Sequence, residues 1–554
     1  MDKIWLKSYA EDVPAEIPTP EFKSLREMIE FAFDEFPDRP AYTNMGTTLS
    51  YRDLDRLSMK FACYLQKSLG LVRGERVAIM LPNLLQYPVV LIGLFRAGLV
   101  AVNVNPLYTA RELRHQLMDS GAKCIIILEN FADTLEEVIG DIKVEHVVTT
   151  QVGDLLSWPK RVVTNFVLKR IRKSVPSFSL PGHVRLRPAL RAGARRHLDH
   201  IELGYADIAF LQYTGGTTGV SKGAMLSHRN MVFNVHQSRA WQADVYADLE
   251  RIIAITALPL YHIFSLQNNC LSVMHQGGEN ILITNPRDLP AFVKEMSRHK
   301  FSYVSGVNTL FAGLLNTPGF ADLDFSGLRL TIGGGMAVQE AISRKWQEVT
   351  GHIIVQAYGL TETSPAAISN PLYLEQFTGS IGLPISSTEA QIVDDDGNEM
   401  TLGEIGEICI RGPQVMEGYW QRPEETEKVM LPGGWLRTGD IGRIDLGGYT
   451  WIEDRKKDMI LVSGFNVYPN EVENVVVEME GILEAAAIGI QDEHSGEVVK
   501  IFAVKTDKSI TEQDVLDYCR ENLTGYKRPK EVEFRDDLPK TNVGKILRRA
   551  LRNE

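Results

Sequence analysis

The amino-acid sequence predicts an α/β protein with a large N-terminal domain of helix-flanked sheets and a smaller α+β domain at the C-terminus. First, the chain has 554 residues, which is more than one hydrophobic core usually supports, so two or more packed domains are expected. Second, apolar strand patterns alternate with amphipathic helical patterns between residues 77 and 128. Third, short alternating strands separated by turns replace this pattern after Gly403.

The N-terminal elements follow from capping and periodicity. Ser24 and Glu27 have the spacing of a capping box at the start of an amphipathic helix. The segments expected next are strand 77–81, helix 84–96, strand 100–104, helix 110–118 and strand 124–128. This alternation indicates a parallel sheet covered by helices. Further apolar runs are found at 208–213, 252–257, 328–332 and 353–357, and each leads into a loop that contains glycine or proline. Loops at the carboxyl ends of such strands are where α/β sheets tend to bind ligands.

The C-terminal part has its own pattern. Turns at Asp396-Gly397, Gly433-Gly434 and Gly447-Gly448 separate short strands. After Asp454 the chain mixes strands and helices over enough residues to form a separate domain. We therefore expect an N-terminal domain of residues 1–456 and a C-terminal domain of residues 457–554.

Composition narrows the class of protein. The net charge of -12 argues against a general nucleic-acid binder. The N-terminus lacks the apolar core of a signal peptide, and the most hydrophobic stretch, 88–104, is too short and too interrupted for a membrane span. The cysteines are widely spaced without a CxxC pair, which predicts free thiols in a cytosolic protein.

One segment, residues 155–198, differs from the rest because it contains eleven Lys or Arg and no Asp or Glu. Within it, an apolar helical face is predicted for Val162, Val163, Phe166, Val167 and Ile171. A basic amphipathic helix of this kind suits the surface of an anionic membrane. A solvated surface insertion explains the pattern equally well, so both interpretations stay open.

A glycine- and threonine-rich segment follows the expected strand 208–213. It offers unencumbered backbone NH groups, hydroxyls and the cation of Lys222, which together suit a polyphosphate ligand. It does not match the GxxxxGK[ST] pattern of a P-loop. Its residues are Tyr213, Thr214, Gly215, Gly216, Thr217, Thr218, Gly219, Val220, Ser221, Lys222 and Gly223, followed by Ala224.

Shorter motifs add carboxylates. Glu362 ends the segment Tyr358-Gly-Leu-Thr-Glu, where a carboxylate suits the magnesium that accompanies ATP. Asp440 ends Trp435-Leu-Arg-Thr-Gly-Asp and suits a ribose diol, and residues 454–458 form a dense charge cluster. Each of these motifs alone is also compatible with a solvated surface turn.

Together with residues 538–548, these motifs have the order and spacing seen in the adenylate-forming superfamily of acyl-CoA synthetases, luciferases and adenylation domains, which the whole chain resembles. Segments 258–264, 306–311 and 458–469 are similar to bacterial long-chain fatty acid–CoA ligases. The resemblance implies a small distorted β-barrel within the large domain and a mobile C-terminal domain. It also implies activation of long-chain fatty acids by ATP to acyl-adenylate and transfer to coenzyme A, which feeds beta-oxidation and fatty acid uptake.

The resemblance also implies residue roles. Lys545, Glu362 and Lys222 would be catalytic, with Lys545 bridging the carboxylate and the α-phosphate of ATP. Mg²⁺ would be held by Thr214 and Glu362. The segment 213–224 would bind the phosphates, and the other AMP-binding residues would be Gly333, Gly334, Gly335, Ala357, Tyr358, Gly359, Thr361, Asp440 and Arg455.

A further set of roles concerns the acyl group, coenzyme A and domain motion. The acyl and coenzyme A residues implied are Tyr261, His262, Phe264, Gly306, Val307, Gly334 and Gly464, and Lys457 matches the hinge. His262 is expected to shape or gate the site rather than act as a base. Phe264 and Leu266 are the candidates for an aromatic or apolar gate. Gly215 and Ser221 replace the serine and proline commonest in the phosphate loop.

The implied partners are fatty acid, ATP, coenzyme A and Mg²⁺, with no nucleic acid. A homodimer is expected, located in the cytoplasm and peripherally on the inner face of the bacterial inner membrane. Two alternatives stay open: an adenylating enzyme that transfers its acyl group to a carrier protein, and a membrane component that traps fatty acid.

Overall fold

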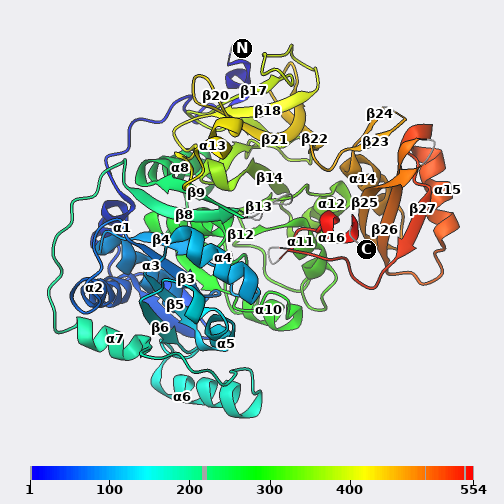
Figure 1. The fold of residues 1–554 in the computed structure, drawn as a ribbon. Helices are drawn as coiled ribbons and strands as arrows, with labels where there is room; N and C mark the ends of the chain where they lie inside the picture. Colours follow the sequence, from blue (N-terminus) through cyan, green and yellow to red (C-terminus); the bar gives the residue numbers. More distant parts are fainter. Residues whose placement is uncertain (1–2, 215–220, 464, 493–494, 542–543, 553–554) are drawn as a thin grey trace.

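The computed structural model describes residues 3–214, 221–463, 465–492, 495–541 and 544–552 (Figure 1). The N-terminal part, coloured blue to green, contains two large mixed sheets with helices around them. A yellow antiparallel sheet lies next to it, and a smaller orange and red α+β unit forms the other end of the molecule. The predicted α/β fold class is confirmed.

The first large sheet carries the phosphate-loop segment. Its strand order is β19-β9-β8-β4-β3-β5-β6-β7, parallel from β8 to β7, whereas β9 is antiparallel to both of its neighbours. Every residue of β4 and β5 is buried, which explains their continuous apolar runs. The strands are β3 (Arg76–Met80), β4 (Val100–Asn103), β5 (Cys124–Leu128), β6 (His146–Thr150), β7 (Val184–Arg185), β8 (Ile208–Thr214), β9 (Lys222–Ser227) and β19 (Gly418–Tyr419).

The second large sheet has the order β16-β15-β14-β13-β12-β10-β11-β1-β2. It is parallel from β14 to β1 and antiparallel at both edges. The parallel arrangement expected for the predicted strands is confirmed, and the antiparallel strands β2, β15 and β16 at the edges were not among those predicted. The strands are β1 (Pro40–Asn44), β2 (Thr47–Ser50), β10 (Ile253–Thr256), β11 (Glu279–Leu282), β12 (Tyr303–Gly306), β13 (Leu330–Gly334), β14 (Ile354–Gly359), β15 (Ala366–Ser369) and β16 (Leu383–Pro384).

Helices surround these sheets and bury their apolar faces against them. The core between the sheets includes Phe61, Phe95 and Phe210, all fully buried. The helices are α1 (Leu25–Glu35), α2 (Tyr51–Lys67), α3 (Gln86–Arg96), α4 (Ala110–Ser120), α5 (Ala132–Glu136), α6 (Trp158–Phe166), α7 (Leu186–Gly193), α8 (His228–Gln242), α9 (Ile263–Ser265), α10 (Leu289–Met296), α11 (Asn308–Leu315) and α12 (Glu340–Thr350).

The start of α1 partly follows the expected capping box. Ser24 Oγ accepts a hydrogen bond from the backbone NH of Glu27 at 3.2 Å, so Ser24 is the N-cap. The Glu27 carboxylate, however, accepts from the backbone NH of Lys23 at 2.7 Å. The helix is therefore correctly predicted, while the reciprocal half of the box is made one residue earlier.

The third and fourth sheets follow in the chain. The third has the order β17-β18-β21-β20, with β22 paired to β21, and occupies the region expected as a small distorted β-barrel. The fourth has the order β24-β23-β26-β25, with β27 paired to β26, and packs on its own apolar core. The strands are β17 (Glu389–Val393), β18 (Gly406–Arg411), β20 (Met430–Leu431), β21 (Trp435–Ile444), β22 (Thr450–Arg455), β23 (Ile460–Val462), β24 (Phe465–Val467), β25 (Ile482–Asp492), β26 (Gly496–Lys505) and β27 (Glu531–Phe534). The accompanying helices are α13 (Pro423–Val429), α14 (Pro469–Glu478), α15 (Glu512–Asn522) and α16 (Arg548–Arg552).

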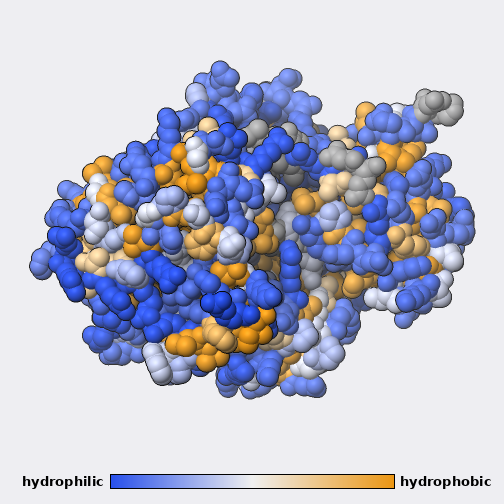
Figure 2. All heavy atoms as spheres, turned by 60° about the horizontal axis from the view of Figure 1, so that its bottom comes forward, coloured by the Kyte–Doolittle hydropathy of each residue, from blue (hydrophilic) through white to orange (hydrophobic). Residues whose placement is uncertain are grey.

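The basic segment 155–198 has two structural parts. Its second half joins the main body, because β7 pairs with β6 and α7 buries Leu186, Ala189 and Leu190. Its first half is α6, continued by a π-helical turn, Val167–Ile171, on the molecular surface. Figure 2 brings the bottom of Figure 1 forward and shows hydrophobic side chains grouped on the face that carries α6.

Two further expectations concern membranes and cysteines. Among the described residues, none of the helices combines the length and the apolar character needed to cross a bilayer. Cys63, Cys124, Cys270, Cys409 and Cys519 are all buried and free, as their spacing predicts.

Candidate active site

The phosphate-loop segment lies at a hairpin between β8 and β9. Thr214 pairs with Lys222 and Tyr213 pairs with Gly223 in the antiparallel register. Ser221 Oγ donates a hydrogen bond to the carbonyl of Thr214 at 2.6 Å, which closes the base of the loop. Ala224, the last residue of the predicted set, is buried in β9. The loop itself, Gly215, Gly216, Thr217, Thr218, Gly219 and Val220, lies outside the described residues.

Lys222 and Glu362 belong to one network of polar side chains. The Lys222 ammonium pairs with the carboxylate of Glu425 and lies 5.1 Å from the centre of the Tyr419 ring. The Tyr419 hydroxyl donates to Glu362 Oε1 at 2.7 Å. Lys222 and Lys428 hold the pKa of Glu425 below its ordinary value. Tyr419 therefore connects two predicted site residues that are far apart in the sequence.

A second network fixes the base of the hairpin. The Tyr213 hydroxyl donates to Asp119 Oδ2 at 2.7 Å. The other oxygen of this carboxylate accepts from the Arg422 guanidinium at 2.5 Å. Burial, and next the hydrogen bond with Asp119, raises the pKa of Tyr213 well above its ordinary value. The hairpin is thus tied to α4 and to the chain after β19 by charge-assisted hydrogen bonds.

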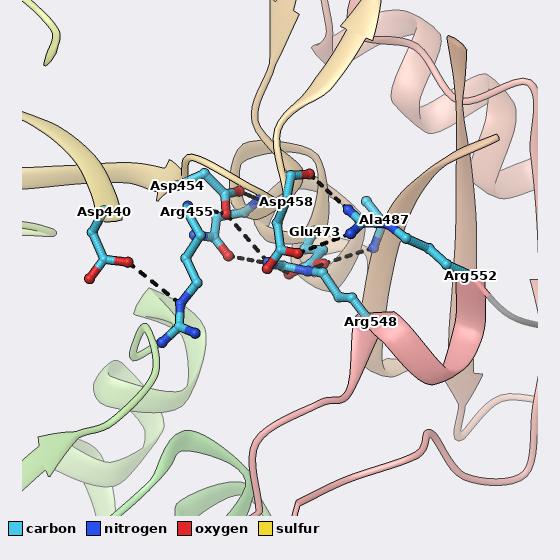
Figure 3. A network of polar contacts seen from close by, with 9 residues as sticks. Asp440, Asp454, Arg455, Asp458, Glu473, Ala487, Arg548 and Arg552 are labelled. Carbon is cyan, nitrogen blue, oxygen red and sulfur yellow. Dashed lines mark hydrogen bonds and ion pairs between the residues drawn. The ribbon is translucent and has the colours of Figure 1, made fainter. Parts of the chain in front are cut away.

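Asp440 and Arg455 lie opposite each other on neighbouring strands β21 and β22. Asp440 Oδ1 is 3.5 Å from Arg455 Nε, as Figure 3 shows, and Asp440 Oδ2 accepts from the Tyr358 hydroxyl at 2.6 Å. Asp440 is almost completely buried. Tyr358 comes from β14 of the second large sheet, so this contact joins the third sheet to the predicted adenine segment.

Two adjacent glycines border the site at the end of β13. A Cβ atom on Gly334 would lie 2.9 Å from the carbonyl oxygen of Ala357 and 3.3 Å from the Phe264 ring. Gly335 has a φ of +78°, and a Cβ atom there would lie 3.3 Å from Lys545 Cε. Both positions therefore require glycine. Gly333 pairs with Gln356 in β14, next to Ala357, Tyr358 and Gly359.

Lys545 reaches this site from the C-terminal end of the chain. The Thr309 hydroxyl on α11 donates to the carbonyl of Gly544 at 3.0 Å, which docks the segment on the large domain. The backbone NH of Lys545 donates to Thr541 Oγ1 at 3.0 Å. Removal from water, and next the cation of Arg455, lowers the pKa of Lys545 to about 8. The charges of Asp440 and Glu362 partly oppose this shift.

Among the predicted acyl residues, His262 is near enough to Lys545 to feel its charge. Burial, and next the cation of Lys545, lowers the pKa of His262 to about 3, so its ring is neutral and unsuited to proton transfer at pH 7. Phe264 and Val307 belong to one apolar cluster, which continues to Tyr303 and Val355. The carbonyl of Tyr261 accepts a hydrogen bond from the Gln212 side chain, Gly306 ends β12, and Leu266 begins a π-helical segment.

The remaining predicted residues have simple placements. Thr361 begins a short 3-10 turn that ends at Thr363 and contains Glu362. Lys457 lies between β22 and β23, where burial, and next Arg455, lowers its pKa. Gly464 lies outside the described residues.

The donor set fits magnesium bound together with ATP. Mg²⁺ prefers hard oxygen ligands and commonly takes only one or two carboxylates when substrate phosphates complete its shell. Glu362 supplies a carboxylate held by Tyr419, and Thr214 supplies a hydroxyl at the hairpin. Within the described ranges, groups of three or more His, Cys, Asp and Glu that would hold a metal alone are absent.

Sequence reasoning missed several residues that shape this site. Tyr419, Glu425, Asp119 and Thr309 have no motif around them, and each acts through a partner distant in the chain. The alternation of Gly418, Tyr419 and Trp420 indicates at most a short strand. No pattern in the sequence would have singled out these side chains.

Comparisons with known proteins identify the relatives of this chain. The family model of AMP-binding enzymes matches residues 29–420, and that of the AMP-binding enzyme C-terminal domain matches residues 471–545. The long-chain-fatty-acid–CoA ligases of Yersinia pestis and Salmonella typhimurium are 55% and 53% identical, over 100% of this chain and 98% of theirs. The crystal structure of the anthranilate CoA ligase AuaEII in complex with anthranoyl-AMP has a TM-score of 0.84 at 26% identity, covering 96% of this chain and 97% of that one.

Proposed function

Because this chain belongs to the family of AMP-binding enzymes, we infer that it activates a carboxylic acid with ATP through an acyl-adenylate. Relatives that match along its full length are long-chain-fatty-acid–CoA ligases. The reaction is therefore the ligation of a long-chain fatty acid to coenzyme A, with ATP converted to AMP and pyrophosphate. We place it at the entry of fatty acids into the cell and into beta-oxidation.

The observation that carries this function is the position of Lys545. Its side chain lies against Gly335, where the charges of Glu362, Asp440 and Arg455 also act on it. In the first half-reaction, a carboxylate oxygen of the fatty acid attacks the α-phosphorus of ATP while the bond to pyrophosphate breaks. Two anions must meet, so a cation at this point lowers the barrier by charge neutralisation.

The other residues orient ATP around this point. We propose that Asp440 accepts from the ribose hydroxyls, with Arg455 beside it, and that the adenine lies between residues 333–335 and 357–359. Lys222 and the β8–β9 hairpin would bind the β- and γ-phosphates. Glu362 and Thr214 would hold Mg²⁺, which supplies neutralisation of the phosphate charge when bound.

The second half-reaction transfers the acyl group. The sulfur of coenzyme A attacks the acyl carbon, the bond to the phosphate oxygen breaks, AMP leaves and the thiol proton is released. We propose that residues 457–554 rotate about Lys457 between the two steps, so that Lys545 leaves and Gly464 borders the pantetheine arm. The change from the third to the fourth sheet between Arg455 and Ile460 supports this boundary.

Separating the half-reactions tests the function. With ATP and Mg²⁺ but without coenzyme A, we expect fatty acid-dependent pyrophosphate release and bound acyl-AMP. Adding coenzyme A should convert the adenylate to acyl-CoA, with rates that rise from acetate to long-chain acids. Lys545→Ala should abolish the first step and keep fatty acid binding. Pyrophosphate release that ignores the fatty acid, or an unaffected Lys545→Ala variant, would refute the assignment.

The same assay addresses the two alternatives. An enzyme that serves a carrier protein would accumulate acyl-AMP with coenzyme A present and discharge it only to the carrier. A component that merely traps fatty acid would bind it without consuming ATP.

We also propose that the enzyme is cytoplasmic and docks peripherally on an anionic membrane through α6. Large apolar side chains of α6 and of the π-helical turn after it point to solvent, with 71% of Trp158, 60% of Val163 and 65% of Ile171 exposed. Its polar side chain Asn165 faces inward, accepting from the backbone NH of Gly153 and donating to Gln151, both at 2.9 Å. This orientation is the reverse of a solvated surface helix and supports docking on a lipid surface.

A homodimer is the proposed assembly, in keeping with the resemblance to bacterial long-chain enzymes. Light scattering of the purified protein tests it: a mass twice the 62.1 kDa of one chain is expected. A mass of one chain at all concentrations would contradict it.

A further inference from the structure

The C-terminal helix α16 follows Lys545 in the chain and begins with Arg548, a partly buried arginine that contacts residues on both sides of the proposed hinge. Arg548 Nε and Nη2 donate to the two oxygens of Glu473 at 2.8 and 2.6 Å, and Nη2 also donates to Asn470 Oδ1 at 2.5 Å. These partners lie on α14 of the small domain. Arg548 Nη1 is 3.4 Å from Asp454 Oδ1, as Figure 3 shows.

Asp454 belongs to the large domain. It lies on β22, where it pairs with Ile441 of β21, and it precedes Lys457 in the chain. Its side chain is completely buried. The backbone NH of Asn470 donates to Asp454 Oδ2 at 2.8 Å, so this carboxylate accepts hydrogen bonds from two elements of the small domain.

The partners of Arg548 therefore separate into two groups. Glu473, Asn470 and Asp458 would move with Arg548 when the small domain rotates about Lys457, whereas Asp454 would stay behind. The contact with Asp454 is present in the orientation seen here, in which Lys545 lies against Gly335, and the proposed rotation about Lys457 would break it. Lys545 is three residues from Arg548, and its loop is held at the other end by Thr309.

We propose that Arg548 is a positioning residue for Lys545, and that its contact with Asp454 is a latch that holds the small domain in the adenylate-forming orientation. This inference rests on the proposed function.

The environment of Asp454 explains how such a latch can both hold and release. Burial raises the pKa of Asp454 to about 6, and Arg548 opposes that shift. A buried carboxylate is unfavourable unless its charge is compensated. Rehydration on rotation therefore favours release, while the Arg548 cation and the NH of Asn470 favour closure. Two orientations of similar free energy are what an enzyme with two consecutive half-reactions requires.

The test compares the two half-reactions of the full-length enzyme. Asp454→Asn keeps the shape and removes the charge that attracts Arg548. We expect adenylate formation, measured as single-turnover pyrophosphate release, to slow by about tenfold, or about 1.4 kcal/mol. Thioester formation from preformed acyl-AMP and coenzyme A should keep its rate or become faster.

Arg552→Gln is the matched control. Arg552 also lies on α16, and it donates to Asp458 Oδ1 at 3.1 Å, a pair that stays on one side of the hinge. Its loss should affect both half-reactions equally. Arg548→Gln should reproduce the selective defect, and adding Asp454→Asn to it should cause no further slowing, because the two residues act through one contact.

Several results would overturn the latch. These are an equal loss of both half-reactions in Asp454→Asn, no loss in either, or additive effects of Asp454→Asn and Arg548→Gln. If a variant lowers the unfolding temperature, the ratio of the two half-reaction rates in one preparation still decides, because a loss of folded enzyme lowers both rates equally. Failure of the wild-type enzyme to form acyl-AMP at all would instead refute the proposed function.

Discussion

Lys545 must carry a positive charge in a place that disfavours it. Desolvation and Arg455 lower its pKa from 10.5 to about 8, although Asp440 and Glu362 pull the other way. The free enzyme therefore begins to lose this charge in a pH range where ordinary lysines keep it. Triphosphate anions would restore the charge on binding, since an opposite charge favours the ammonium form.

This shift predicts a pH dependence for adenylate formation. Because the needed form is protonated and its pKa is about 8 in the free enzyme, kcat/KM for ATP should fall as pH rises above about 8, by about tenfold per pH unit. The thioester step, started from preformed acyl-AMP, should lack this decrease. Lys545→Arg should lack it as well, whatever its absolute rate. A shared decrease in both half-reactions would mean that another group titrates.

Tyr419 provides a second prediction. Its hydroxyl is 2.7 Å from Glu362 Oε1, and a hydrogen bond to a charged group is worth about 1.5–3 kcal/mol. Tyr419→Phe should therefore lower kcat/KM for ATP by about tenfold or more and increase the Mg²⁺ concentration needed for half-maximal rate. Tyr449→Phe, which removes a hydroxyl near the surface, is the control. Equal rates for both variants would show that Tyr419 does not orient Glu362.

The site could be predicted from the sequence only where residues lie within one motif. Glu362, Asp440 and Lys222 were found because their neighbours form recognisable segments. Tyr419 was missed because it contacts Glu362 across 57 residues, and Thr309 because it contacts Gly544 across 235 residues. Contacts of this kind depend on the packing of sheets, which a local pattern does not contain.

Helices and strands were predicted best where one face or both faces are buried. Strand β5 has the expected bounds, and α4 ends two residues later than expected, at Ser120 before the left-handed Gly121. The antiparallel strand β9 was not predicted, since no expected element covered residues 222–227. The sequence correctly predicted that α6 is amphipathic. Periodicity alone, however, does not tell whether the apolar or the polar face of a helix packs on the protein.

We predict weaker membrane binding when the basic side chains that follow α6 are neutralised. Lys169, Arg170, Arg172 and Lys173 are exposed, and each basic residue near an anionic surface contributes about 1 kcal/mol. Replacing all of them by glutamine should strongly reduce co-sedimentation with vesicles containing phosphatidylserine. The rate of acyl-CoA formation from dissolved short acids should not change.

A matched control removes exposed basic residues elsewhere, namely Lys294 and Arg298 on or after α10 and Arg344 and Lys345 on α12. This variant should bind vesicles like the wild type. If both variants lose binding equally, the interaction reflects overall charge and α6 is not the docking element.

At the scale of the whole molecule, two units are joined through residues 455–460, and each contains hydrophobic clusters of its own. The core of the small unit includes Val472, Val499 and Ile501 and is separate from that of the large sheets. Lys545 and Arg548 belong to the small unit yet contact residues of the large one. In the proposed rotation, the site would therefore be complete only in the orientation seen here.

Restricting the backbone at the proposed hinge should slow thioester formation much more than adenylate formation. Proline fixes φ near −65°. Lys457→Pro should therefore keep adenylate formation within about tenfold of the wild type and slow thioester formation by more than about a hundredfold. Lys457→Ala removes the same side chain without restricting the backbone and should retain both steps. Rapid thioester formation by the proline variant would place the rotation elsewhere.

The uneven distribution of charge along the sequence affects how the protein approaches a membrane before contact. The chain has a net charge of -12, yet residues 155–198 hold eleven cations and no carboxylate. The surface around α6 therefore carries a local excess of positive charge. Near a negatively charged bilayer, the field would attract this surface toward the lipid within about a Debye length, roughly 8 Å at physiological ionic strength. The protein would then meet the bilayer mainly in one orientation. Added salt would randomise this orientation at lower concentrations than those that weaken the bound contact.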